Sequence, residues 1–165
     1  MSTQMKETND QRIFRHTNSQ KGRHISVTPA NSAMKFLVYG RVILDQEVPA
    51  VTFSTGALES GLICLAGECT IKADGQSNTI GQYDSIYLPR DTNVEITTDS
   101  SVDLVECAAE VDNKYPLQVV RYADVEKDSS LKFKTGGPAT TRTVNITLGK
   151  NVEAGRILAG FTTSE

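Results

Sequence analysis

Four polar side chains near the C-terminal end of the chain could bind a small acid. Arg142 and Asn145 lie in the segment TRTVNITL, and Arg156 and Thr162 lie in RILAGFT. A guanidinium group can hold a carboxylate through two parallel hydrogen bonds. We therefore predict that Arg142, Asn145, Arg156 and Thr162 bind substrate. The alternative role for the arginines is a salt bridge on the surface or between structural units.

The spacing of two of these residues limits how they can act together. Both segments alternate apolar and polar residues, which is typical of β-strands. Successive side chains of a strand point to opposite faces, so Arg142 shares a face with Val144 and Asn145 shares a face with Thr143. Arg142 and Asn145 are therefore predicted to face opposite sides of one strand.

Histidines and cysteines, which are common metal ligands and nucleophiles, are few and scattered along the chain. The chain has two histidines, His16 and His24, and three cysteines, Cys64, Cys69 and Cys107. No second cysteine pair or nearby histidine completes a zinc-ligand set around CLAGEC. We expect small buried thiols in strands and no metal held by this chain.

The composition bounds the class of protein. Of the 165 residues, 38% are hydrophobic and 22% are charged, with a formal net charge of −3. Such a chain can bury a core, and it lacks the clustered basic residues of a nucleic-acid binder. No apolar run is long enough for a membrane span or a secretory signal. We predict a cytoplasmic protein without nucleic-acid or membrane partners.

Short apolar runs separated by turn residues predict an all-β fold. The expected strands lie at 34–44 (a strand pair or a strand broken at Gly40), 48–52, 61–65, 69–73, 77–80, 85–88, 93–97, 102–108, 141–148 and 156–162. Asp74-Gly75 predicts a tight hairpin. The only helical candidate is a turn or two near Asp124–Leu131, which Asp124 could cap, and Thr135–Pro138 reads as a linker.

The region between Val51 and Glu95 has the pattern of a cupin barrel. A strand ends in Gly67-Glu68, the hairpin follows, and GQYDSIYLP closes the pattern. In the cupin family, which this pattern resembles, four side chains hold a divalent metal. Two histidines and a glutamate come just before the first turn, and a third histidine comes after the segment that ends in proline.

The positions that correspond to these ligands carry other residues here. The two histidine positions fall near Phe53 and Thr55, and the glutamate position falls near Glu59 or Ser60. The last histidine position falls near Asn93 or Val94. Because such metals need three or four converging ligands, a lone Glu59 cannot form a site, and we predict a cupin barrel without metal.

Longer motifs resemble bacterial 5-deoxy-glucuronate isomerase of myo-inositol catabolism, from about residue 20 to the end. The matching segments are GRHISVTP, GQYDSIYLPR, KYP, VRY, GGP, TR, LG, AGR and GFT. This family is related to the 4-deoxy-5-threo-hexosulose-uronate ketol-isomerases. The resemblance implies two cupin barrels, of which the N-terminal one lacks metal and the C-terminal one carries a divalent metal, expected to be zinc.

The resemblance also implies the domain organisation. We expect a flexible lead-in at 1–22, a metal-free cupin-type jelly-roll barrel at 23–134, and a linker with the opening strands of a second, truncated cupin barrel at 135–165. The family's metal-binding histidines come after the segment that matches Phe161-Thr162, and we expect them to be missing here.

The implied reaction is an aldose–ketose isomerisation of 5-deoxy-glucuronate to 5-dehydro-2-deoxy-gluconate. It moves a proton between C1 and C2 of an open-chain sugar acid, and it needs a base, a group that polarises the carbonyl and a cation for the carboxylate. The catalytic residues are not identified by the sequence. Two alternatives stay open: a non-catalytic cupin domain for binding or dimerisation, and a metal-independent cupin enzyme. Homo-oligomerisation is left open as well.

Overall fold

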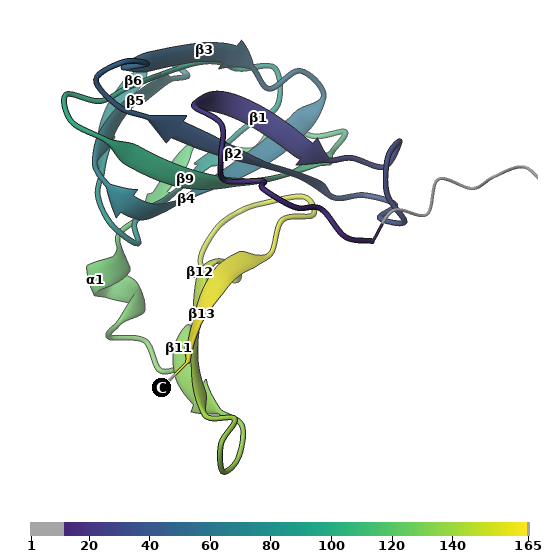
Figure 1. Cartoon of the computed structure of the whole chain (residues 1–165), viewed down its shortest axis with the longest axis vertical. Coiled ribbons are helices and arrows are strands. Elements are labelled where there is room, and N and C mark those ends of the chain that lie inside the picture. The colour runs from purple at the N-terminus through teal and green to yellow at the C-terminus, as the bar shows by residue number, and fades with distance from the viewer. Residues whose placement is uncertain (1–11, 165) are drawn as a thin grey trace, which may run out of the picture.

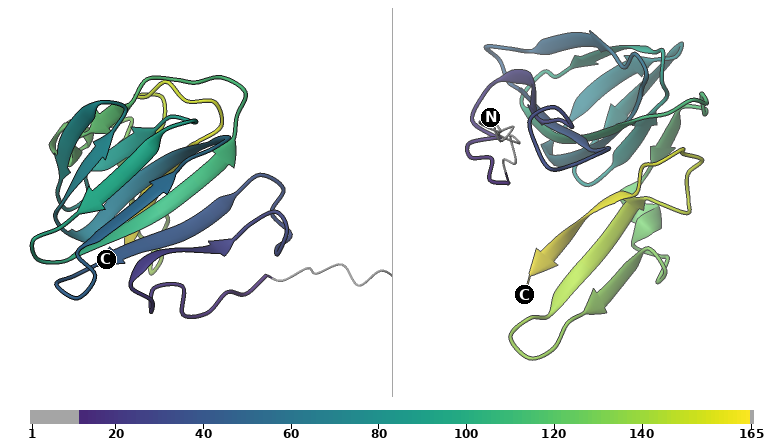
Figure 2. Two further views of the ribbon diagram at one scale, coloured as in Figure 1. Left: turned by 90° about the horizontal axis from the view of Figure 1, so that it is seen from above. Right: turned by 90° about the vertical axis from the view of Figure 1, so that its right-hand side faces the viewer.

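The computed structural model describes residues 12–164, which form three antiparallel β-sheets (Figure 1). Of the predicted lead-in, residues 1–11 lie outside the described part, as does residue 165. Two of the sheets face each other, and the third extends from them as a smaller unit (Figure 2). The class is therefore all-β, as predicted from the sequence.

The larger sheet has six strands in an order that differs from the order along the chain. Across the sheet these are β1 (Gly22–Val27), β2 (Val38–Leu44), β9 (Val102–Glu110), β4 (Leu58–Gly67), β7 (Ser85–Leu88) and β10 (Gln118–Val120). Strand β9 lies between β2 and β4, which precede it by many residues. Non-consecutive neighbours of this kind are typical of a jelly roll.

The second sheet has four strands and covers the inner face of the first. Its order is β3 (Ala50–Ser54), β8 (Asn93–Thr97), β5 (Cys69–Ala73) and β6 (Gln76–Ile80). Alternate residues of both sheets fill the space between them, and the fully buried ones include Leu62, Ile71, Ile86, Ile96 and Leu104. The result is a cupin-type jelly roll with its core between the two sheets.

The predicted hairpin at Asp74-Gly75 is confirmed. Ala73 of β5 pairs with Gln76 of β6, so two residues connect the strands. Both connecting residues have positive φ, 49° for Asp74 and 74° for Gly75. This is the backbone of a type I′ turn, whose twist matches that of the strands it joins.

The start of the barrel differs from the prediction. Strand β1 was not predicted and pairs along β2, and β2 runs unbroken through Gly40. A Cβ atom on Gly40 would lie 2.5 Å from the carbonyl oxygen of His24. Glycine at this position therefore permits the close approach of β1 and does not end a strand.

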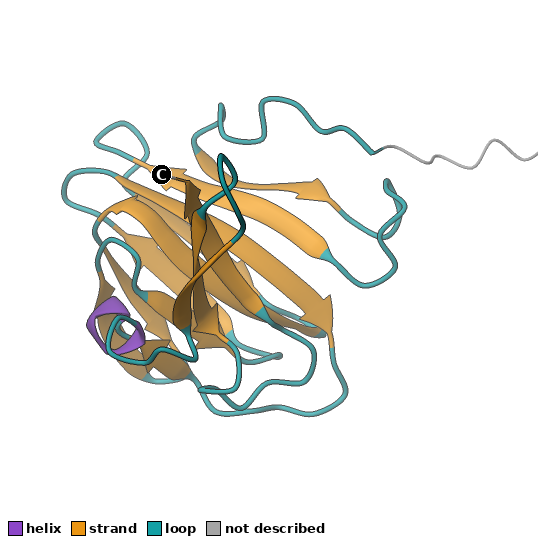
Figure 3. Ribbon diagram, turned by 90° about the horizontal axis from the view of Figure 1, so that it is seen from below, coloured by secondary structure: helices purple, strands orange, loops and turns teal. Residues whose placement is uncertain are grey.

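The third sheet contains β11 (Lys132–Thr135), β12 (Arg142–Leu148) and β13 (Ala159–Ser164), and it follows the short helix α1 (Tyr122–Val125) (Figure 3). The helical turn is present, but Asp124 lies inside α1 and does not cap it. Strand β11 was not predicted. Within residues 12–164, no helix is long and apolar enough to cross a membrane.

The third sheet packs against the outer face of the six-stranded sheet through an apolar cluster. Its buried members are Tyr87, Val120, Val125, Leu131 and Leu148. A Cβ atom on Gly61 of β4 would lie 2.5 Å from Cδ1 of Leu148, so Leu148 rests on bare backbone. This contact fixes β12 relative to the barrel.

Candidate functional site

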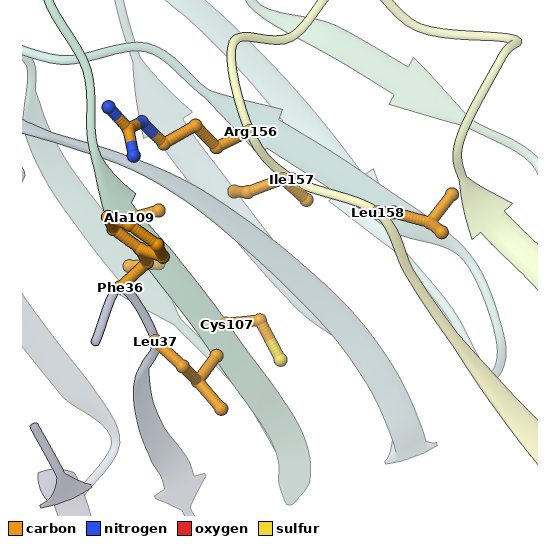
Figure 4. Close-up of a pocket in the computed structure, with 8 residues that line it drawn as sticks. Phe36, Leu37, Cys107, Ala109, Arg156, Ile157 and Leu158 are labelled. Atoms are coloured by element: carbon orange, nitrogen blue, oxygen red, sulfur yellow. The ribbon is translucent and has the colours of Figure 1, made fainter. Parts of the chain in front are cut away.

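Of the four predicted substrate-binding residues, Arg156 lies at a cavity. This cavity of about 360 Å³ lies between β9, the loop before β2 and the loop before β13 (Figure 4). Its lining is largely apolar and consists of Phe36, Leu37, Cys107, Ala108, Ala109, Arg156, Ile157 and Leu158. The guanidinium carbon of Arg156 lies 4.9 Å from the centre of the Phe36 ring.

The Arg156 guanidinium is available to a ligand. Among residues 12–164 it forms no ion pair or hydrogen bond, and its side chain is exposed. A guanidinium that stacks on an aromatic ring keeps its N–H groups free to hold a carboxylate. The groove beside Arg156 can therefore bind a small acid with its carboxylate at the rim.

The other three predicted residues lie in the third sheet and divide between its faces. Arg142 and Thr162 are exposed on one face, because Thr162 pairs with Val144, the second residue after Arg142. Asn145 is buried on the opposite face, as the strand alternation predicts. The structure does not bring the four residues together around one cavity. Their joint role as one substrate site therefore stays a prediction.

Asn145 has structural partners. Its side-chain oxygen accepts a hydrogen bond of 3.0 Å from the hydroxyl of Tyr122. Tyr122 is part of an aromatic cluster with Tyr83 and Phe161, in which the rings of Tyr83 and Phe161 stack at 4.6 Å. Asn145 therefore connects β12 to α1.

Glu59 is the most heavily bonded carboxylate among the described residues. It is 0% exposed, and its Oε2 accepts hydrogen bonds of 2.8 Å from the Tyr87 hydroxyl and the Gly155 amide. Its Oε1 accepts the amides of Arg156 at 2.5 Å and Ile157 at 2.8 Å. Burial and this carboxylate raise the pKa of Tyr87, which stays a neutral donor.

These bonds explain why the predicted strand at 156–162 begins only at Ala159. The amides of residues 155–157 turn toward one carboxylate on β4 instead of joining a strand ladder. A buried carboxylate needs several donors to offset its lost hydration. Glu59 thus anchors the segment that carries Arg156 to the barrel.

The structure settles which residue of each alternative pair, Glu59 or Ser60 and Asn93 or Val94, points into the barrel. Ser60 is the buried inward residue of β4, whereas Glu59 points out to the 155–157 segment. Phe53 and Val94 pair across β3 and β8 and both contact the core. These inward positions are therefore a phenylalanine, a serine and a valine. Thr55, at the other histidine position, is buried and donates to the carbonyl oxygen of Pro89 at 2.8 Å.

A partly buried ion pair reaches into the same interior. Glu106 of β9 is 1% exposed and accepts two hydrogen bonds from Arg23 of β1, at 2.7 and 2.9 Å. Ser60 donates to the same carboxylate at 3.0 Å. The Arg23 guanidinium lies 4.0 Å above the centre of the Phe53 ring.

Sequence reasoning missed this pair, although one signal was present. In β9 the inward positions read Val102, Leu104, Glu106 and Ala108, so a carboxylate interrupts an apolar face. A charge at such a position needs a partner, because burying it alone is costly. The partner, Arg23, lies 83 residues away along the chain.

The described residues, 12–164, do not fit the divalent metal of cupins. Within residues 12–164 no three His, Cys, Asp or Glu side chains lie close enough together to share an ion. Both oxygens of Glu59 are taken by protein donors, and His24 contacts the carbonyl oxygen of Lys21 at 2.7 Å. No catalytic step can be assigned to a metal held by these residues.

The three cysteines are expected to react slowly with thiol reagents. Burial raises the pKa of Cys64 to about 11 and that of Cys69 to about 12, and it raises the pKa of Cys107 as well. At pH 8 a thiol of pKa 11 is ionised in only about one molecule in a thousand, and the thiolate is the reactive form. Labelling with a chromogenic disulfide should therefore be slow until the protein is unfolded. Fast release of one equivalent from Cys64 or Cys69 in the native protein would contradict this.

The two packed sheets and their interior define the class of protein as a cupin-type jelly roll. The chain belongs to the KduI/IolB family, whose model matches residues 13–165. This is a family of sugar-acid isomerases, so the resemblance found in the sequence is confirmed at that level. No curated protein matches the sequence.

Solved structures support the fold. An IolB-like protein from Salmonella typhimurium LT2 superposes with a TM-score of 0.71 and 21% identity, covering 84% of this chain and 54% of that one. A protein of unknown function from Pseudomonas syringae pv. tomato has a TM-score of 0.50 and 15% identity, covering 77% of this chain and 53% of that one. The chain thus spans about half the length of the IolB-like protein.

Proposed function

We propose that this chain contributes the metal-free barrel of a 5-deoxy-glucuronate isomerase of myo-inositol catabolism. The family match over residues 13–165 is the observation that carries the proposal. The complete protein would convert 5-deoxy-glucuronate to 5-dehydro-2-deoxy-gluconate in the cytoplasm, with a divalent metal such as zinc held outside the residues described here.

The contribution of this chain to that reaction would be binding and positioning. Arg156 supplies the cation that the carboxylate of a sugar acid requires, and its side chain is exposed at a cavity. Glu59 fixes the backbone on which Arg156 lies. Arg142 and Thr162 share the open face of the third sheet and could contact the same class of ligand there.

A non-catalytic cupin domain for binding or dimerisation is the second candidate. It is favoured by the barrel interior, where Phe53, Ser60 and Val94 lie at the ligand positions and the Arg23–Glu106 ion pair contacts Phe53 and Ser60. Under this hypothesis the chain would bind a sugar acid or a second copy of itself without turnover.

The two candidates are separated by assaying the 165-residue chain with 5-deoxy-glucuronate in the presence of zinc. We expect no appreciable turnover, because the described residues offer no ligand set for the metal. The matched assay uses an extended chain that includes a second barrel, and turnover there supports the isomerase. Comparable turnover of both proteins would show that the active site lies in this barrel, against our proposal.

A binding measurement completes the experiment. We expect Arg156→Met to weaken binding of 5-deoxy-glucuronate by about tenfold or more, since a charge-assisted hydrogen bond contributes roughly 1.5–3 kcal/mol. Arg15→Met is the matched variant, because Arg15 is also an exposed arginine but does not line this cavity. Equal losses in the two variants would show nonspecific attraction to positive charge.

A further inference from the structure

The strongest unassigned feature of the molecule is the set of groups around the Arg23 guanidinium inside the barrel. Three kinds of group from three strands surround it. The Glu106 carboxylate of β9 accepts two parallel hydrogen bonds, and the Phe53 ring of β3 offers its face at 4.0 Å. The Ser60 hydroxyl of β4 donates a hydrogen bond of 3.0 Å to Oε1 of the same carboxylate.

Each of these groups suits a planar cation. A carboxylate matches the fork of a guanidinium, and the face of an aromatic ring attracts positive charge. A buried carboxylate that keeps a third donor, here Ser60, is held in one orientation. These three side chains therefore form a binding site, and Arg23 is its ligand.

The site occupies the place where the sequence pattern put the metal. Phe53 corresponds to a histidine position and Ser60 to the glutamate position, and both contact the ion pair directly. Register confirms that Arg23 points inward, because it pairs with Val42, a buried core residue of β2. The barrel thus keeps a cation in its interior, but the cation is a side chain.

We propose that Glu106, Ser60 and Phe53 form a binding site for guanidinium-type cations, which Arg23 fills from within the same chain. Strand β1 carries this ligand at the edge of the six-stranded sheet, where it has β2 as its one neighbour in the sheet. The Arg23 side chain is 21% exposed, so a path leads from solvent to the site. A small free cation can enter when the arginine side chain is removed.

The test is chemical rescue of Arg23→Ala. Removing Arg23 leaves the Glu106 carboxylate without its cation, and we expect the melting temperature to fall by roughly 10 °C. Methylguanidinium should restore about half of that loss when it reaches about 100 times its Kd, and above its Kd the rise should follow the logarithm of its concentration. Wild-type protein should show no such rise, because its site is already filled.

Two controls isolate the site. The double variant Arg23→Ala/Glu106→Gln lacks the charged acceptor and should not respond to methylguanidinium. Urea, which is neutral and of similar shape, should not rescue Arg23→Ala. An unchanged melting temperature in Arg23→Ala would overturn the proposal, as would an equal response of the single and double variants.

A milder variant keeps the proposal testable if Arg23→Ala does not fold. Arg23→Lys retains a cation but replaces the two-pronged contact with a single ammonium group. We expect a smaller fall in melting temperature and no response to methylguanidinium. Wild-type stability in Arg23→Lys would show that any positive charge suffices and that no guanidinium site exists.

Discussion

Replacing Glu59 with alanine is expected to release the 155–157 segment and to lower the free energy of unfolding by about 3–5 kcal/mol. Four hydrogen bonds are lost at once, three of them from backbone amides. The hydroxyl of Tyr87, a residue that is 0% exposed, loses its acceptor as well. An unsatisfied buried donor is itself destabilising.

Hydrogen exchange would show where the stability is lost. Faster exchange should concentrate in β12 and β13 and leave the core strands of the barrel protected. Glu95→Gln is the matched control, because Glu95 forms only a surface ion pair with Lys72 and should change stability by less than about 1 kcal/mol. If amides of residues 142–164 exchanged in Glu59→Ala at the wild-type rate, Glu59 would not be needed to anchor this segment to the barrel.

Replacing Leu148 with alanine should cost about 2–5 kcal/mol in the free energy of unfolding. Leu148 is 0% exposed and rests on Gly61 at the centre of the cluster that joins the third sheet to the barrel. Truncation leaves a cavity that backbone atoms of β4 cannot fill. Urea denaturation of the wild-type and variant proteins measures the loss.

The chain offers a close control for this substitution. Leu158 lies in the same C-terminal region but is 74% exposed, so Leu158→Ala should change stability by no more than about 0.5 kcal/mol. Similar losses for the two substitutions would mean that the cluster around Leu148 does not join the sheet to the barrel. A loss confined to Leu148→Ala supports the packing described here.

The strands of the barrel core were predictable because their signals are local. The runs SIYL and NVEIT lie between turn residues, and both form strands close to the predicted bounds. Strand β1 carries no such signal, because GRHISV alternates weakly and all six residues are only partly buried. Its position beside β2 depends on Gly40, because a side chain there would collide with the backbone of β1. This requirement cannot be seen until both strands are placed.

The candidate site was less predictable, because its key contacts join distant parts of the chain. The sequence singled out Arg156 for its chemistry, but the cavity beside it requires Phe36 and Cys107 from separate elements. Glu59 was considered as a metal ligand, and the choice between Glu59 and Ser60 depended on strand orientation. A β-strand shifted by one residue exchanges its faces, and a short apolar run does not fix that register.

The position of β9 between β2 and β4 has a consequence for the order of events during synthesis. Strand β2 ends at Leu44 and β4 at Gly67, but the strand that pairs with both is complete only at Glu110. A ribosome adding about 5–20 residues per second leaves those two strands without their shared partner for several seconds. Their apolar faces are then open to chaperones or to other nascent chains, and slow translation between Gly67 and Glu110 would lengthen that interval.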